Sequence, residues 1–205
     1  MGRRSQIYRE QEGQQIPGIS LQAFIHNGPA YYLTDIMVYR DGMVDCWGLI
    51  DLDEFKDKIA SGWVVTTLPE GAEISISLLC GFHATNVHSF IKESEFVKEV
   101  EDEIERLNGR QTAFDRCYAA HENYNADPSE STRAALKVAY EAVPEHIRPF
   151  LGDMDVKDIP IRMIIYGDAE LESWSHRVVA RQLGVELLPT ITVRRPKDFE
   201  PGGES

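Results

Sequence analysis

The chain has 205 residues, of which 42% are hydrophobic and 27% charged, a composition typical of a globular protein with one domain or two small ones. Its formal net charge of -13 argues against binding to nucleic acid or to anionic membranes, because an acidic surface repels phosphate groups. No run approaches the roughly 20 apolar residues that span a bilayer, so no membrane segment is expected.

The cysteines and the N-terminus bear on the cellular compartment. Cys46, Cys80 and Cys117 are far apart and odd in number, which fits a reducing environment better than a disulfide framework. No apolar stretch follows the first residues, so a signal peptide is not expected. We therefore predict a cytoplasmic protein.

The first part of the chain is predicted to be rich in strands. Residues 1–15 are polar and predict a flexible arm, and residues 16–90 predict a β-rich domain with strands at 32–39, 43–52, 63–67 and 73–78. Asp41-Gly42 predicts a tight type I′ hairpin turn, because glycine and aspartate tolerate positive φ. Asp51 or Asp53 is expected to cap a short helix that ends at Gly62. Together these elements predict a small antiparallel sheet or open barrel with one inserted helix.

Residues 91–150 are predicted to be a helical region. Apolar residues recur at helical spacing in 96–107, and Asn108-Gly109 is a stop signal. A second helix carries Cys117 and Tyr124 on one stripe. A third is expected to begin at Asp127, with proline at its first position. It is expected to pack through small residues, namely Ala135, Val138, Ala139 and Ala142.

The last part of the chain is predicted to return to mixed structure. Residues 151–195 form an α/β closing element, with a strand at 161–166, a helix at 169–183 and a strand at 189–193. The two strands could pair in parallel through the helix as a βαβ-like element, or they could extend the N-terminal sheet. Residues 196–205 are expected to be a flexible tail. The fold class predicted for the whole chain is α+β.

The densest group of ionisable residues lies around this predicted strand. In an extended segment Asp153 and Asp155 would point the same way, with Cβ atoms about 6–7 Å apart, which is twice the rise per residue of a strand. With Asp158 they form a candidate site for a hard divalent ion, Mg²⁺ or Mn²⁺. In this interpretation the catalytic residues are Asp153, Asp155, Arg162 and His176, with the imidazole as general base or ligand. The alternative is a surface turn between Gly152 and Pro160, since aspartate is common in turns.

A second candidate site lies on the predicted hairpin. Asp45, Trp47 and Asp51 share one face of the return strand. An exposed tryptophan among acidic residues suits a cationic or aromatic peptide; the alternative is that a neighbouring helix covers Trp47. The acidic stretch from Glu93 to Glu105 is a further candidate surface for a basic partner.

Several short motifs together resemble an uncharacterised bacterial protein family. They are Asp41-Gly42, Cys46-Trp47-Gly48, Gly62-Trp63-Val64, residues 152–162, Trp174-Ser175-His176-Arg177 and Leu188-Pro189-Thr190-Ile191. The resemblance covers about residues 30–193. It implies a bacterial, cytoplasmic origin and carries over no activity and no catalytic residue.

Two functional hypotheses stay open. The first is an acidic interaction protein of the immunity, defence-accessory or adaptor type that acts by protein–protein binding. It rests on the net charge and on the absence of a phosphate loop, a nucleophile elbow and a zinc-protease motif. The second is a metal-dependent hydrolase of phosphate esters that uses the aspartate cluster with His176 and Arg162. No cofactor is predicted outside the second hypothesis, and the oligomeric state is not predicted.

Overall fold

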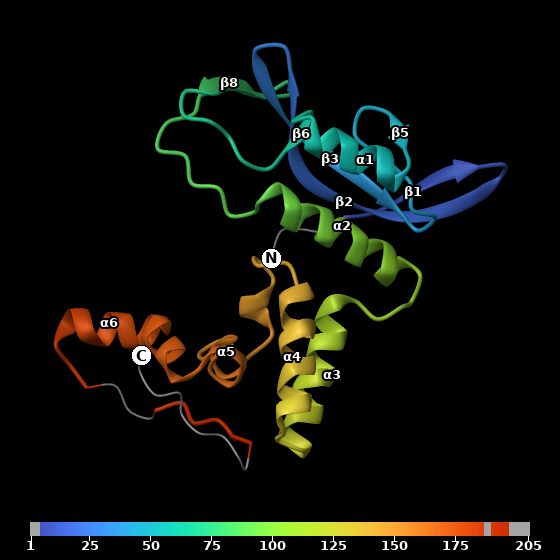
Figure 1. Cartoon of the computed structure of the whole chain (residues 1–205). Helices are drawn as coiled ribbons and strands as arrows, with labels where there is room; N and C mark the ends of the chain where they lie inside the picture. The colour runs from blue at the N-terminus through green and yellow to red at the C-terminus, as the bar shows by residue number, and fades with distance from the viewer. Residues whose placement is uncertain (1–4, 187–189, 197–205) are drawn as a thin grey trace. The chain divides into compact units, whose positions relative to one another are not determined.

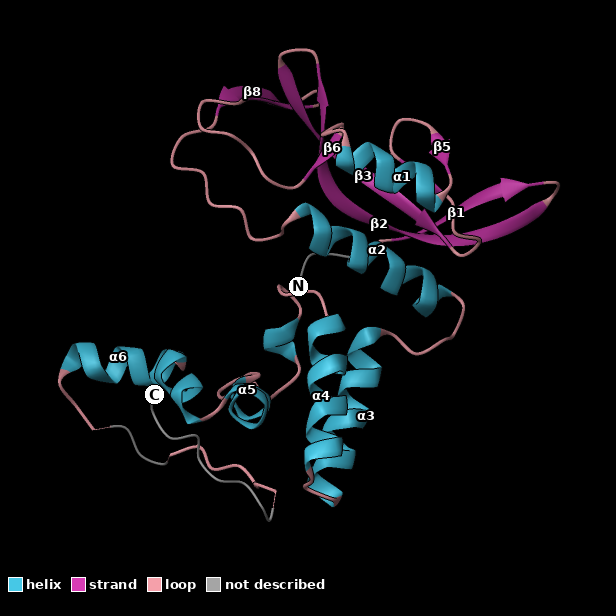
Figure 2. Ribbon diagram, viewed as in Figure 1, coloured by secondary structure: helices cyan, strands magenta, loops and turns pink. Residues whose placement is uncertain are grey.

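The chain is made of two compact units, residues 1–112 and residues 113–205. The computed structural model describes residues 5–186 and 190–196 (Figure 1). Every strand in this described part lies in the first unit, and helices make up the second (Figure 2). The α+β class is therefore confirmed. No helix in the described ranges is long and apolar enough to cross a membrane.

The first unit is built on one mostly antiparallel sheet. Its central pair is β2 (Gln14–Asn27) with β3 (Ala30–Tyr39), and β1 (Gln6–Gln11) pairs with the outer edge of β2. Beyond β3 lie β4 (Val44–Asp45) and β5 (Leu49–Ile50). The remaining strands are β6 (Val64–Val65) on β2, β7 (Glu73–Ile76) parallel to β3, and β8 (Cys80–His83) on β7.

The flexible arm predicted for residues 1–15 is wrong over its described part. Residues 6–11 pair with β2 in register from Gln6 opposite Ile19 to Gln11 opposite Gln14. The hairpin turns through Glu12 and Gly13, both at positive φ (52° and 77°), which is the geometry of a two-residue type I′ turn. A polar edge strand shows no alternation of apolar residues in the sequence. Backbone hydrogen bonds to the neighbouring strand, and not buried side chains, hold it in place.

The hairpin predicted at Asp41-Gly42 is present with a different turn. The loop has three residues, Arg40 to Gly42, and among them only Gly42 has positive φ (87°). The Gly42 amide donates to the Tyr39 carbonyl at 3.0 Å, and the Tyr39 amide donates to the Met43 carbonyl at 2.9 Å. This is the three-residue hairpin with its last residue in the left-handed region, and the type I′ assignment is corrected.

Two helices cover one face of this sheet. The first, α1 (Leu52–Ala60), begins as predicted at Asp51, whose Oδ1 accepts from the Glu54 amide at 2.9 Å, and Gly62 follows it at φ 74°. The second, α2 (Glu93–Leu107), follows the predicted stripe and ends at Asn108. Phe55 from α1 and Phe96 from α2 join a core with sheet residues such as Ile25 and Ile36. Because α2 packs into this core, the boundary between the units falls after residue 112, whereas the sequence predicted it after residue 90.

Glu93 attaches the first turn of α2 to the segment that follows β6. Its Oε1 accepts from the Thr66 amide at 3.1 Å, the Thr67 amide at 2.9 Å and the Thr67 hydroxyl at 2.6 Å. Partial burial raises the pKa of this carboxyl, but the hydrogen bonds to the charged form outweigh burial and lower the pKa overall. The ionised Glu93 side chain therefore stabilises the folded state.

We expect Glu93→Gln to lower the free energy of unfolding by about 1.5–3 kcal/mol at neutral pH, the usual contribution of a hydrogen bond to a charged group. A carboxyl with a lowered folded-state pKa stabilises fully above its unfolded pKa of about 4.3 and loses this contribution as pH falls through the folded value. The difference between wild type and variant should thus shrink in acid. Urea unfolding at neutral and acidic pH measures this, with Glu10→Gln on exposed β1 as control. A difference independent of pH would contradict the role of the charge.

The second unit opens with a helical hairpin, α3 (Ala113–Ala126) and α4 (Glu130–Ala142). The N-cap of α4 is Ser129, which exchanges hydrogen bonds with Thr132, and the predicted cap Asp127 is therefore wrong. Leu136 and Tyr140 supply the buried contacts of α4, and the predicted stripe of small residues is wrong because Val138 is exposed. The unit continues with η1 (Arg148–Phe150), α5 (Ile159–Tyr166), η2 (Asp168–Ser173) and α6 (Ser175–Leu183).

The βαβ-like element is corrected. The predicted strand at 161–166 lies within α5. Of the predicted strand at 189–193, residue 189 lies outside the described residues and residues 190–193 form no strand. Residues 197–205 of the predicted tail also lie outside the described residues. The apolar run 163–166 is too short to show a period that distinguishes a strand from a buried helix. Pro160, at the first turn of α5, is the local signal for a helix start. The closing element is therefore helical in the described part of the chain.

Candidate functional site

The aspartate-rich segment before α5 is a compact turn. Asp153 Oδ1 accepts from the Asp155 amide at 2.7 Å, and the Asp153 carbonyl accepts from the Lys157 amide at 2.7 Å. Lys157 has positive φ (53°), and Gly152 packs directly against the Lys157 carbonyl group. The segment is therefore a turn, as in the alternative prediction. It does not have the extended geometry that would point the Asp153 and Asp155 carboxylates the same way, so that prediction is wrong.

The structure does not group the predicted metal ligands. The Asp153 and Asp155 side chains are exposed, whereas Asp158 is buried and accepts from the Tyr140 hydroxyl at 2.6 Å. Within the described ranges no three His, Cys, Asp or Glu side chains lie close enough together to hold a metal ion. The set of Asp153, Asp155 and Asp158 as ligands for Mg²⁺ or Mn²⁺ does not fit this structure.

His176 does not join the other predicted catalytic residues either. It is exposed in the first turn of α6, where its ring lies 5.2 Å from the ring of Trp174. The Trp174 indole donates to the backbone carbonyl of Asp155 at 2.8 Å. This hydrogen bond joins the turn to the start of α6 through the backbone and leaves the Asp155 carboxylate uninvolved.

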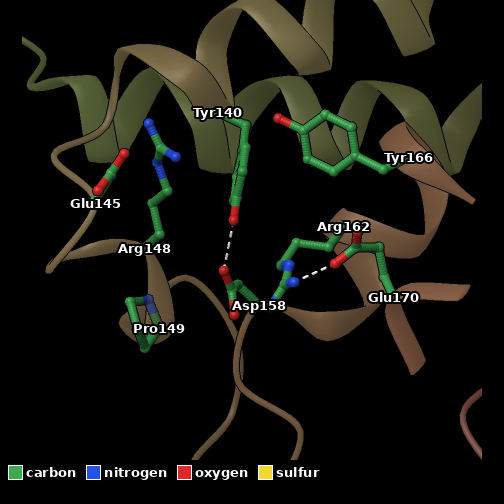
Figure 3. A pocket seen from close by; sticks show the side chains of 8 residues that line it. All are labelled: Tyr140, Glu145, Arg148, Pro149, Asp158, Arg162, Tyr166 and Glu170. Atoms are coloured by element: carbon green, nitrogen blue, oxygen red, sulfur yellow. Dashed lines mark hydrogen bonds and ion pairs between the residues drawn. The ribbon is translucent and has the colours of Figure 1, made fainter. Parts of the chain in front are cut away.

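Two of the predicted site residues, Asp158 and Arg162, do meet in a cavity of about 330 Å³ in the second unit (Figure 3). We call it the charged cavity. It is lined by Tyr140, Glu145, Arg148, Pro149, Asp158, Arg162, Tyr166 and Glu170. These residues come from α4, the segment around η1, α5 and η2, so the cavity exists only where four elements converge.

Hydrogen bonds orient the side chains of the charged cavity. Figure 3 shows the Tyr140 hydroxyl directed at Asp158 and the Arg162 guanidinium directed at Glu170, with which it forms an ion pair. Burial and then the hydrogen bond to Asp158 raise the pKa of Tyr140 far above its usual value, so its hydroxyl stays protonated and donates. Arg148 lies over the Tyr140 ring at 5.0 Å and donates to the carbonyls of Val143 (2.9 Å) and Glu141 (3.0 Å).

Sequence reasoning missed Tyr140 and Arg148. The spacing of Leu136 and Tyr140, four residues apart, is a signal that Tyr140 faces inward on α4. No sequence pattern predicts the position of Arg148. Its guanidinium is held by two backbone carbonyls, and every residue has a backbone carbonyl whatever its type.

A second candidate site is an aromatic surface on the first unit, formed by Tyr32, Trp47 and Trp63. The ring of Trp47 lies 5.3 Å from that of Tyr32 and 6.2 Å from that of Trp63. Lys58 Nζ lies 5.0 Å from the centre of the Trp63 ring. Trp47 is 51% exposed, so the prediction of an exposed tryptophan is correct and the alternative of a covering helix is not.

The backbone at Trp47 is unusual for so large a side chain. Trp47 has φ 67°, in the left-handed region that favours glycine, and it occupies the turn between β4 and β5. The Gly48 amide donates to Asp45 Oδ1 at 3.0 Å, and the Cys46 amide donates to the Gly48 carbonyl at 3.2 Å. Asp45 thus stabilises the turn that presents Trp47.

Comparison with known families divides the chain at the same place as the structure. A family model described as a domain of unknown function (DUF7638) matches residues 6–111, and a second (DUF7639) matches residues 112–191. No curated protein and no solved structure matches the chain. The predicted resemblance to an uncharacterised family is confirmed, and each family domain corresponds to one compact unit.

Proposed function

We propose that this chain, which belongs to the DUF7638 family of domains of unknown function, is a protein-binding module that captures a positively charged peptide segment on its aromatic surface. The observation that carries the proposal is Trp47, half exposed on a left-handed backbone between Tyr32 and Trp63. This is a concrete form of the interaction protein expected from the sequence.

The left-handed backbone of Trp47 costs free energy that burial of its side chain does not offset. A side chain other than glycine in the left-handed region costs about 1–2 kcal/mol, and a half-exposed indole buries less apolar area than a core tryptophan. Such local strain concentrates at functional positions. Tryptophan is also enriched among the residues that dominate binding energy at protein interfaces. A partner that covers the indole explains why the turn presents it.

The surrounding charge favours a basic partner. Residues 1–112 contain 18 Asp and Glu against 10 Lys and Arg, and the stretch 45–57 around Trp47 contains five acids and one lysine. An arginine or lysine of the partner can approach the acids and also lie over an indole face. The acidic helix α2, the further candidate surface for a basic partner, adds to the negative potential of this unit. Not all of its acids are available to a partner, since Glu103 is 1% exposed and paired with Arg106.

Selection from a random peptide display library on the full chain tests the proposal. We expect selected peptides to be enriched in Arg or Lys beside an apolar residue, and their affinity to fall as salt rises. Trp47→Ala should weaken a selected peptide about 30-fold or more, the effect of removing an interface residue that contributes about 2 kcal/mol. Phe90→Ala, which truncates an aromatic that is 89% exposed in the loop before α2, is the matched control and should leave affinity unchanged.

Two results would overturn the proposal. One is a set of selected peptides without basic residues; the other is equal affinity for wild type and Trp47→Ala. Circular dichroism of Trp47→Ala checks that the fold is kept. Alanine has the same left-handed strain as tryptophan, and truncating a half-exposed indole removes little buried area, so we expect only a small loss of stability.

The cellular setting predicted from the sequence remains part of this proposal. Cys46, Cys80 and Cys117 are free thiols, which supports a reducing cytoplasm, and the bacterial origin rests on the resemblance alone. The alternative hypothesis of a metal-dependent hydrolase of phosphate esters finds no comparable support, because its carboxylate ligands are not grouped in the described part of the chain.

A further inference from the structure

The charged cavity of the second unit contains a carboxylate, Asp158, that forms no ion pair with either arginine of the cavity in the described part of the chain. Asp158 is only 6% exposed, and it stands at the N-cap position of α5 without making the side-chain capping bond. Its Oδ2 accepts from Tyr140, whereas its Oδ1 accepts no hydrogen bond from any residue in the described ranges. The Oδ1 atom is open to the cavity, so a donor on a molecule bound there can reach it.

The cations of the cavity are also incompletely used. Arg162 contacts Glu170 through one terminal nitrogen, Nη2, and its Nε and Nη1 donate to no acceptor in the described part of the chain. Within the same ranges no ion pair joins Asp158 to Arg162 or to Arg148, although all three line the cavity. The space between the carboxylate and the guanidinium is therefore a place where a ligand can satisfy both.

The charges and the size select the ligand. A simple anion would meet Asp158 and Glu170, and a simple cation would meet Arg148 and Arg162, so either would face a like charge. A zwitterion brings one partner for each sign. The volume of about 330 Å³ lies at the small end of ligand pockets, which suits a molecule the size of an amino acid.

We infer that the charged cavity binds a free α-amino acid, with its ammonium group on Asp158 and its carboxylate on the guanidinium of Arg162. Arg162 is the anchor for the carboxylate because Arg148 already donates to two backbone carbonyls. Charge-assisted hydrogen bonds of both kinds are stronger than neutral ones, and a cavity set between four elements holds their donors and acceptors in place. This site does not depend on the aromatic surface.

A thermal-shift screen of the full chain with each standard L-α-amino acid at millimolar concentration tests the inference. We expect at least one of them to raise Tm in proportion to the logarithm of its concentration, as mass action requires. Its methyl ester lacks the carboxylate and its N-acetyl derivative lacks the ammonium, and each should produce a much smaller shift. Asp158→Asn should abolish the response, while Asp155→Asn, an exposed position in the same turn, should retain it.

A second variant keeps the test decisive if Asp158→Asn does not fold. The Tm of Arg162→Gln should respond equally to the amino acid and to its methyl ester, because this variant lacks the guanidinium that binds the carboxylate. Trp47→Ala should respond as wild type does, which separates this site from the peptide-binding surface. The inference is overturned if no amino acid shifts Tm, if ester and N-acetyl derivative act as well as the parent, or if Asp158→Asn responds normally.

Discussion

Phe55→Ala is expected to lower the free energy of unfolding of the first unit by about 3–5 kcal/mol, the usual cost of truncating a fully buried phenylalanine. Phe55 is fully buried on α1, and its ring lies 6.2 Å from that of Phe96 on α2 in an edge-on arrangement. Removing it leaves a cavity where both helices meet the sheet. The loss should therefore reach both helices and the sheet beneath them.

Amide hydrogen exchange of β2 and β3 measures this effect on the first unit alone, which matters because two units need not unfold together. Phe90→Ala makes the same chemical change at an exposed position and should cost less than about 0.5 kcal/mol. The double variant with Phe96→Ala should cost less than the sum of the two single variants, since the residues share one contact. Strict additivity would show that α1 and α2 do not share this core.

Gly152→Ala is expected to cost about 3 kcal/mol or more, at the upper end of what overpacking costs. A Cβ at Gly152 would overlap the backbone carbonyl of Lys157, and backbone atoms cannot move aside as a side chain can. The turn would have to open, which would break the hydrogen bond from the Lys157 amide to the Asp153 carbonyl. Asp158 follows directly, so its contact with Tyr140 should weaken as well.

Chemical denaturation followed by circular dichroism, where helices of the second unit contribute, measures the loss. Gly48→Ala is the matched control, because a Cβ at Gly48 meets no atom within 4 Å and its φ is not positive. Equal stability of Gly152→Ala and wild type would mean that the turn is not closed as described. The aspartates would then be free to adopt the extended arrangement of the metal hypothesis.

Local signals were sufficient wherever an element is specified by its own residues. The capping carboxylate of Asp51 and the left-handed Gly62 bracket α1 as predicted, and the apolar stripe of α2 ends at Asn108 as predicted. In each case the physical cause, a cap, a stop or a period, lies within a few residues of the element itself.

Of the candidate site, the sequence indicated Asp158 and Arg162 but grouped them with the wrong neighbours. The predicted grouping with Asp153 and Asp155 requires an extended segment, whereas the close contact of Gly152 with the Lys157 carbonyl makes the segment a turn. Tyr140 reaches Asp158 from α4, 18 residues earlier, through packing that no spacing rule describes. Charge and chemistry could be read from the sequence, but convergence in space could not.

The sequence by itself determined the α+β class, the acidic charge and the caps of α1, since these depend on composition and on neighbours along the chain. Only the tertiary structure decided that residues 6–11 form a strand, that the segment 161–166 is a helix and that Asp158 faces a cavity. The reason is physical: an edge strand is held by the backbone of another strand, and the apolar run 163–166 is too short to show whether its period is that of a helix or of a strand.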